Sequence, residues 1–291
     1  MPECSVYFQP QSMADALKLL MNFDGNLKPL AGGTDILPDM KKGKLKNAGL
    51  LDLSKISDIR KISIQGNAIT LGSLCTFSQI ENSHLIQERV PLLAEAAASV
   101  GSPQIRNLGT VGGNIANASP AADTVNALVA LDAKAKLDSA EGSRTVLVSE
   151  LLCGVGKTNI QPQEILTEIS FEIPKNESKS GFIKLGRRKA LAIARMSLAM
   201  IITEQEGVIR YARVSLGAVG PNPSRNAALE EYLIGEIPTE SLVNSFAEKA
   251  SLEVTRMLGS RASASYKREA IKGIARDLAG RLLLGTKQVV M

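Results

Sequence analysis

The chain has 291 residues, of which 44% are hydrophobic and 22% charged, and its formal net charge is +5. This composition is typical of a soluble globular protein of about two domains. No apolar run approaches the roughly 20 residues that a membrane-spanning helix needs. Aromatic residues make up only 3% and tryptophan is absent. This argues against a nucleic-acid-binding protein, because such proteins combine basic patches with aromatic stacking.

Cysteine and histidine are too few and too scattered for a metal site. Cys4, Cys75 and Cys153 have no zinc or iron–sulfur spacing and imply no disulfide framework. The single histidine, His84, follows two polar residues and is expected on the surface. The first four residues lack the basic and apolar regions of a signal peptide. We therefore expect a reduced, cytoplasmic protein without a metal of its own.

The first part of the chain, about 55 residues, predicts a small α/β unit. Pro29 interrupts one of its strands and places that strand at a sheet edge or a strand end. The expected elements are a strand at 6–8, a helix that begins after Ser12, a strand at 27–31, a helical turn at 36–40 and a strand at 49–53.

A larger α/β unit is expected up to residue 173. It begins with a hairpin, because Gly66-Asn67 is a turn dipeptide between two alternating segments. Further along, Ser119 followed by Pro120 predicts a helix that has Asp123 in its first turn. The other expected elements are helices at 76–80 and 91–100 and strands at 62–65, 68–71, 133–137, 144–148 and 165–173.

A polar stretch at 174–181 is the best candidate for a domain boundary. The pattern beyond it predicts a separate α+β domain. Its expected strands cover 182–185, 197–204 and 211–217, and its expected helices cover 226–233, 241–258 and 265–284.

Two glycine pairs stand out as candidate binding loops. Leu30-Ala31-Gly32-Gly33-Thr34-Asp35 follows one predicted strand, and Thr110-Val111-Gly112-Gly113-Asn114 lies in a run of small residues. Glycine has no Cβ, so a ligand can approach the backbone closely, and successive N–H groups can surround an anion. Two such loops suit an extended anion such as a dinucleotide pyrophosphate, although each could also be an ordinary tight turn. Neither has the Gly-x-Gly-x-x-Gly spacing of a Rossmann site.

The sequence AGGTD followed by RNLGTVGGNIANASPAAD resembles the FAD-binding (medium) subunit of the molybdenum hydroxylases, the xanthine dehydrogenase and carbon monoxide dehydrogenase family. The resemblance covers almost the whole chain. It implies an α+β protein: a two-subdomain FAD-binding fold of the vanillyl-alcohol-oxidase/PCMH type, then a C-terminal α+β domain with a three-stranded sheet and helices. The implied FAD-binding domain covers 1–176, with subdomains at about 1–56 and 57–176, and the C-terminal flavoprotein domain covers 177–291.

The resemblance also implies an oxidoreductase subunit that transfers electrons through FAD. The iron–sulfur clusters and molybdopterin are expected on partner subunits, and NAD is the leading electron acceptor. Xanthine or a related N-heterocycle is the leading substrate; carbon monoxide and nicotinate remain open. The alternatives are a self-contained flavin oxidase or reductase of the same fold and a flavin-free scaffold or assembly protein.

The resemblance assigns cofactor-binding positions but no catalytic residue. Asp123 falls near the ribityl and adenosine portion, Leu166 on the adenine, and Lys184 near the pyrimidine end of the flavin. From the residues alone, these three could equally be a helix-start acid, a core leucine and a solvated strand lysine. The basic start of the segment 187–194, near the flavin in relatives, could attract an anionic acceptor or be a solvated turn. The full implied set is Leu30, Ala31, Gly32, Gly33, Thr34, Asp35, Ile36, Thr110, Val111, Gly112, Gly113, Asn114, Ala116, Asn117, Asp123, Leu166 and Lys184.

Overall fold

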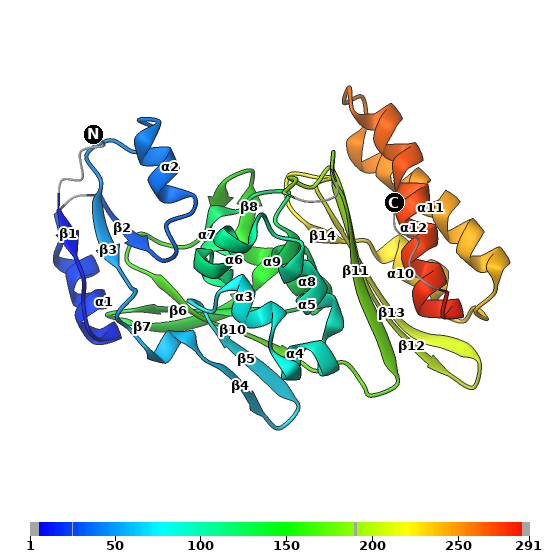
Figure 1. Cartoon of the computed structure of the whole chain (residues 1–291), viewed down its shortest axis with the longest axis horizontal. Helices are drawn as coiled ribbons and strands as arrows, with labels where there is room; N and C mark the ends of the chain where they lie inside the picture. Colours follow the sequence, from blue (N-terminus) through cyan, green and yellow to red (C-terminus); the bar gives the residue numbers. More distant parts are fainter. Residues whose placement is uncertain (1–5, 25, 189–190, 287–291) are drawn as a thin grey trace.

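The computed structural model describes residues 6–24, 26–188 and 191–286. Three units follow one another along the long axis of the molecule (Figure 1), each with its own main sheet and its own hydrophobic cluster. Cys4 and the rest of the amino-terminal segment considered above lie outside the described residues, as do Lys189 and Ala190. Within the described part, no helix is long and apolar enough to cross a membrane.

The first unit is a small parallel sheet with one helix packed on it, as the sequence predicts. Ser12 caps that helix by accepting a hydrogen bond from the N–H of Asp15, and the helix buries Ala16 and Leu20 in this unit's core. The strand that contains Pro29 is indeed at an edge, because the sheet order is β1-β3-β2. The elements are β1 (Tyr7–Phe8), α1 (Met13–Asn22), β2 (Leu27–Leu30), α2 (Ile36–Lys41) and β3 (Gly49–Asp52).

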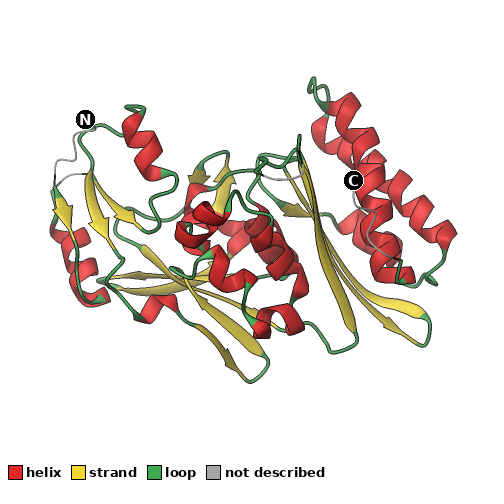
Figure 2. Cartoon of the chain, viewed as in Figure 1, coloured by secondary structure: helices red, strands yellow, loops and turns green. Residues whose placement is uncertain are grey.

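The middle unit packs a row of short helices on a five-stranded sheet of order β4-β5-β10-β6-β7 (Figure 2). All its strand pairs are antiparallel, so the prediction of a second α/β unit was wrong and this unit is α+β. Its strands are β4 (Ile62–Gln65), β5 (Ala68–Gly72), β6 (Lys134–Ser139), β7 (Gly142–Leu147) and β10 (Ile165–Glu172), with a small hairpin of β8 (Leu152–Gly154) and β9 (Lys157–Thr158) beside it.

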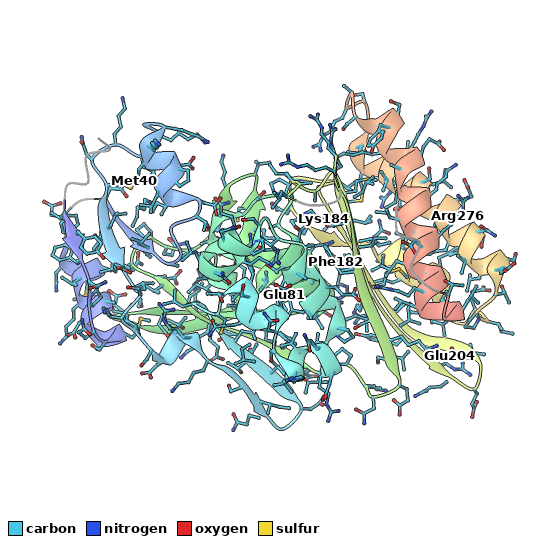
Figure 3. The ribbon with its side chains drawn as sticks, in the orientation of Figure 1. Met40, Glu81, Phe182, Lys184, Glu204 and Arg276 are labelled. Atoms are coloured by element: carbon cyan, nitrogen blue, oxygen red, sulfur yellow. The ribbon has the colours of Figure 1, made fainter. Side chains whose placement is uncertain are left out.

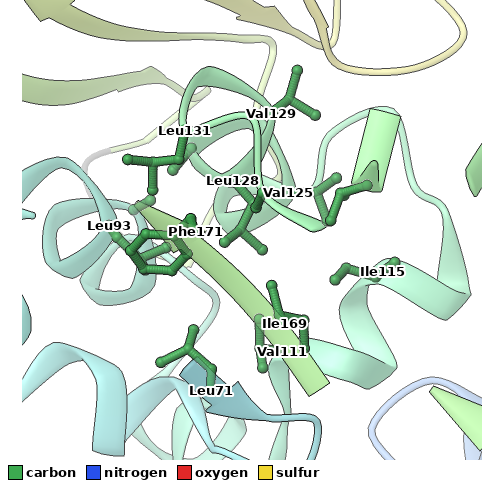
Figure 4. Close-up of a cluster of buried hydrophobic side chains, with 14 of the residues drawn as sticks. Leu71, Leu93, Val111, Ile115, Val125, Leu128, Val129, Leu131, Ile169 and Phe171 are labelled. Atoms are coloured by element: carbon green, nitrogen blue, oxygen red, sulfur yellow. The ribbon is translucent and has the colours of Figure 1, made fainter. Parts of the chain in front are cut away.

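The helices of the middle unit bury their apolar faces against that sheet. Figure 4 shows Ile169 and Phe171 of the central strand among Leu93, Val111 and Leu128 of three helices. The helices are η1 (Asp58–Arg60), α3 (Phe77–Glu81), α4 (His84–Arg89), α5 (Pro91–Ala98), α6 (Pro103–Leu108), α7 (Val111–Asn117), α8 (Asp123–Ala130) and α9 (Val148–Leu151).

The third unit is an antiparallel sheet of order β11-β12-β13-β14 with two long helices on one face. Phe246, on the first of those helices, is fully buried in its core. The elements are β11 (Ser178–Leu185), β12 (Met196–Gln205), β13 (Val208–Gly217), β14 (Ser224–Arg225), α10 (Ala227–Leu233), α11 (Glu240–Leu258) and α12 (Ala264–Leu284).

Three local predictions were wrong. The helix predicted from Pro120 begins at Asp123, because Ala118 adopts a left-handed conformation (φ 46°) and residues 119–122 form a turn. The strand expected from 182 begins at Ser178, since its register with Thr203 continues into the polar stretch. The C-terminal sheet has a fourth strand, β14, which was too short to leave a sequence pattern.

Helix α8 joins the middle and third units. Each of its residues is buried, and it packs on β12 and β13. Asn126 is the polar link: its amide donates to Ser197 Oγ (3.0 Å), and its carbonyl oxygen accepts from Ser215 Oγ (2.6 Å). All three side chains are fully buried, so each satisfies groups that water cannot reach.

We predict that Asn126→Ala lowers the free energy of unfolding by about 1–3 kcal/mol, because it leaves the buried hydroxyl groups of Ser197 and Ser215 without their hydrogen-bond partner. Urea unfolding measures this change. The matched control is the triple variant Asn126→Ala, Ser197→Ala, Ser215→Ala, which should recover part of the loss because no polar group remains unpaired. A triple variant less stable than the single one would contradict this account.

Candidate cofactor-binding groove

Two adjoining cavities lie between the first and middle units. The first has a volume of about 670 Å³ and the second about 550 Å³. They share Pro29, Ala31, Ile36, Gly113 and Ala116, so they form one continuous groove. The volume of each cavity is within the range typical of small-molecule and cofactor sites.

The loop between β2 and α2 forms one wall of the second cavity. Gly33 has φ +72°, a left-handed conformation that glycine adopts without strain. Among the described residues, the backbone N–H groups of Gly32, Gly33 and Thr34 donate no hydrogen bond. These donors line the groove, which is the arrangement that the predicted anion site requires. Asp35 follows, and partial burial raises the pKa of its carboxyl group.

The opposite wall differs from its prediction, because Thr110–Asn114 is no loop. Thr110 caps helix α7 by accepting from the N–H of Gly113 (3.2 Å), and the N–H groups of Val111 and Gly112 donate to the carbonyl groups of Cys75 and Ser73. Its N–H groups are therefore used within the protein. What this wall offers is the bare Cα of Gly113: a Cβ there would meet only Thr110 Oγ1 at 3.0 Å and Ala31 at 4.0 Å.

The two glycine pairs have divided roles. A Cβ on Gly32 would overlap the carbonyl oxygen of Leu108, and one on Gly112 would overlap Ser73. These two glycines therefore allow close packing: Gly32 packs on Leu108 of the middle unit, and Gly112 packs on Ser73 within the middle unit. All four glycines line the groove, and Gly113 is the one at which a Cβ would have the most room.

The groove brings together nearly all the residues that the sequence assigned to it. Leu30 is absent from the lining, and Val111 has its side chain in the core of the middle unit. The predicted residues that line the groove are Ala31, Gly32, Gly33, Thr34, Asp35, Ile36, Thr110, Gly112, Gly113, Asn114, Ala116, Asn117, Asp123, Leu166 and Lys184.

Sequence reasoning missed Ser73 and the segment Gln161 to Gln163, both of which line the first cavity. Ser73 is buried, and its Oγ has no hydrogen-bond partner among the described residues. The sequence feature that could have indicated Ser73 is its position directly after strand β5. The loop at 161–163 precedes Leu166 and carries two amide side chains. Because Leu166 was predicted to contact the cofactor, these neighbouring amides could also have been predicted as cofactor-binding residues.

Asp123 and Lys184 form a buried ion pair at the far end of the second cavity. Lys184 Nζ lies 2.5 Å from Asp123 Oδ2 and donates to the carbonyl oxygen of Ser99 (2.9 Å). Figure 3 shows Lys184 and Phe182 along β11, at the junction with the middle unit. The other carboxylate oxygen, Asp123 Oδ1, is buried with no partner among the described residues. This oxygen can therefore accept a hydrogen bond from a hydroxyl group of a ligand.

Burial dominates the electrostatics of Asp123. It raises the pKa of the carboxyl group from its usual 3.8 to about 6, although the charge and hydrogen bond of Lys184 pull the pKa down. The Asp123 side chain is 4% exposed and that of Lys184 is 12% exposed. The structure thus brings together two residues that are 61 positions apart in sequence.

Two family models match the chain. "FAD binding domain in molybdopterin dehydrogenase" matches residues 2–176, and "CO dehydrogenase flavoprotein C-terminal domain" matches residues 182–282. The first contains the groove walls from β2 to Leu166, and the second contains Lys184 and most of the segment from β11 to α12.

Similar proteins match nearly end to end. The chain is 34% identical to the nicotinate dehydrogenase FAD-subunit of Eubacterium barkeri over 94% of both chains. It is 32% identical to the glyceraldehyde dehydrogenase medium chain of Sulfolobus acidocaldarius, over 93% of this chain and 95% of that one. A solved structure of carbon monoxide dehydrogenase from Hydrogenophaga pseudoflava superposes with a TM-score of 0.89 and 27% identity, over 98% of this chain and 99% of that one.

We predict that Asp123 makes stability depend on pH. Between pH 3.8 and about 6 the folded carboxyl group keeps a proton that the unfolded chain has released, so its contribution to stability falls as the pH rises. The wild type should therefore lose on the order of 3 kcal/mol relative to Asp123→Asn across this window, with no further change above it. Urea unfolding of both proteins at several pH values measures the difference.

Lys184→Met serves as the matched comparison. Without the ammonium group the pKa of Asp123 rises further, so the loss of stability with rising pH should continue to a higher pH than in the wild type. A pH-independent difference between the wild type and Asp123→Asn would mean that Asp123 does not titrate as described.

Proposed function

Because the chain belongs to the family of FAD-binding subunits of the molybdenum hydroxylases, we propose that it is the electron-transfer subunit of such a multi-subunit enzyme. It takes electrons from a partner iron–sulfur subunit, which receives them from a molybdopterin subunit where the substrate is hydroxylated. It passes them to an acceptor, for which NAD is our choice. FAD, the cofactor of this family, supplies a carrier that accepts and releases one or two electrons.

The continuous groove between the two glycine-containing walls carries this proposal. Its residues fit FAD on three counts. Gly32 to Thr34 offer unused N–H donors for a pyrophosphate. Buried Asp123 Oδ1 and Ser73 Oγ are free to bond hydroxyl or ring atoms. Gly113 leaves open the space that a Cβ would occupy.

The charges and apolar surfaces suggest how the groove orients the cofactor. Leu166 lines the first cavity with Leu20 and Phe23, an apolar environment for an adenine ring. Lys184 lies at the other end, where a cation stabilises negative charge on the reduced flavin ring. Asp123 holds Lys184 in place through the ion pair. We assign the pyrophosphate to the middle, where the two cavities share Ala31 and Gly113.

An N-heterocycle, with xanthine as the leading candidate, is the substrate that we propose for the whole enzyme. The similar chains named for nicotinate and caffeine dehydrogenases support this class, while those named for carbon monoxide and glyceraldehyde dehydrogenases show how varied the partner chemistry is. This chain contributes no residue to that chemistry, because the substrate site is on another subunit in our proposal.

The visible spectrum of the purified chain tests the proposal directly. We expect flavin absorption, release of FAD identified by chromatography, and co-purification from the native source with one iron–sulfur and one molybdopterin subunit. Absence of flavin from both the chain incubated with FAD and the native complex would contradict the proposal and favour a scaffold role.

We predict that Gly113→Val lowers the flavin content several-fold, because its side chain extends into the groove and not into the protein. The ratio of flavin absorption to protein measures this. Gly32→Ala is the contrasting variant: its methyl group overlaps the Leu108 carbonyl, so it should lower thermal stability as well as flavin content. Normal flavin content in a folded Gly113→Val protein would rule out this wall as part of the site.

A further inference from the structure

A separate cleft lies between the middle and third units, and we call it the junction cleft. Its volume is about 340 Å³. It is bounded by the end of α4, the linker between β10 and β11, the start of β11 and the last turns of α12. None of its lining residues lines the two cavities assigned to the cofactor, so it is a different site.

The junction cleft is positively charged. Glu88 is the one acidic residue in its lining, and Arg281 and Lys179 are held by carboxylates outside the lining, Glu95 (2.8 Å) and Glu204 (3.6 Å). The other two cations have no carboxylate within ion-pair distance among the residues that the structure describes. The four cations are Arg89, Lys175, Lys179 and Arg281.

Arg281 reaches the cleft across strand β11. A Cβ on Gly181 would overlap its guanidinium group, so the guanidinium lies directly on this glycine. Its Nη2 donates to Glu95 Oε2 (2.8 Å), which also accepts from the backbone N–H of Phe182 (2.7 Å). The guanidinium is thus fixed between α5 of the middle unit and β11. Its Nε and Nη1 donate no hydrogen bond within the described part of the chain.

The start of β11 leaves one backbone position open at the cleft. β11 is an edge strand, and alternate residues of an antiparallel edge strand point their N–H groups away from the neighbouring strand. Phe182 is such a residue, because its N–H donates to Glu95, and Ser178 is another, because its N–H donates to the carbonyl oxygen of Lys175 (2.8 Å). Ser180 lies between them in the same register, so its N–H also points outward. Neither this N–H nor Ser180 Oγ has a hydrogen-bond partner among the described residues.

The side chain of Ser180 is on the face of β11 that packs on the middle unit. Side chains alternate between the two faces of a strand, and Phe182, two positions further on, is buried in the core of the middle unit. The Ser180 hydroxyl group is therefore on the same side as α4, whose last residue is Arg89. Arg89 Nη1 donates to Asn176 Oδ1 (3.1 Å), which holds the guanidinium at the cleft, and the other Arg89 N–H groups are unused in the described structure.

We propose that the junction cleft binds a phosphate group, with Arg89, Arg281 and Ser180 as its ligands. Guanidinium groups bind phosphate oxygens through paired N–H donors, and Ser180 adds a hydroxyl and a backbone N–H. A peptide strand does not fit this edge, because the Lys175 carbonyl and the Glu95 carboxylate occupy the positions on either side of Ser180. The site goes beyond the proposed function and does not depend on a flavin.

A bound phosphate would connect three elements that are far apart in sequence. It would join α4 of the middle unit to β11 and α12 of the third unit. Because a ligand that binds only the folded state stabilises it, phosphate should hold these two units together more firmly.

Thermal unfolding of the full chain with excess FAD tests this proposal. The Tm should rise and saturate with inorganic phosphate or glycerol 3-phosphate, but not with sodium chloride at equal ionic strength. Isothermal titration calorimetry gives the two dissociation constants. Tighter binding of glycerol 3-phosphate would identify a phosphorylated metabolite as the ligand, and tighter binding of inorganic phosphate would identify the free ion. Absence of saturable binding for both would overturn the proposal.

Arg89→Ala places the phosphate in the cleft. It should weaken binding about tenfold, because one charged hydrogen-bonding group is lost. Arg268→Ala is the matched control, since it removes the same charge from a side chain that is 52% exposed. It lies near the start of α12, about 20 Å along the helix from Arg281. Its dissociation constant should equal that of the wild type. Equal weakening in both variants, or none in Arg89→Ala, would overturn the assignment.

Ser180→Asp tests the open strand position itself. Its carboxylate would lie among the same cations and repel a phosphate, so saturable phosphate binding should be lost while the thermal unfolding transition stays cooperative. Phosphate binding at the wild-type affinity in this variant would overturn the role of Ser180. Flavin content should be unchanged in all three variants, so a chain that never holds FAD would contradict only the function proposed above.

Discussion

Direct packing of backbone on backbone sets the geometry of this protein. Gly32 lies against the Leu108 carbonyl group, Gly112 against Ser73 and Gly72 against the backbone of Ile59. No side chain fits at these points. The contact of Gly32 with Leu108 brings the first unit close to the middle unit, and the other two contacts lie within the middle unit.

The sequence predicted much of the local structure because its signals were local. The helix after Ser12, the helix at 76–80 and the Gly66-Asn67 hairpin depend on residues a few positions apart, and each is present. Helix α7 was missed because glycine disfavours helices, and here tertiary packing on Ser73 overrides that preference. The antiparallel middle sheet was missed because strand direction depends on pairing, which no single segment encodes.

In the candidate site, too, the features with local sequence signals were predicted and those that depend on long-range packing were not. Its glycine walls were found because small residues cluster visibly in the sequence, and the structure gathers most of the predicted lining residues in one groove. The Lys184–Asp123 pair could not be foreseen, because it depends on the third unit packing on buried helix α8. Ser73 Oγ, which has no partner among the described residues, could not be foreseen because its burial depends on how β5 and α7 pack. The domain limits and individual cofactor contacts stay predictions.

The position of β10 has a consequence for how the chain acquires its structure. This central strand pairs with β5, which precedes it by about a hundred residues, and it must be made before the middle sheet can close. Until then β5 and β6 have no common neighbour, and the apolar faces of α5 and α8 have no complete surface to cover. A nascent chain therefore remains open through most of its synthesis, and the long separation slows folding.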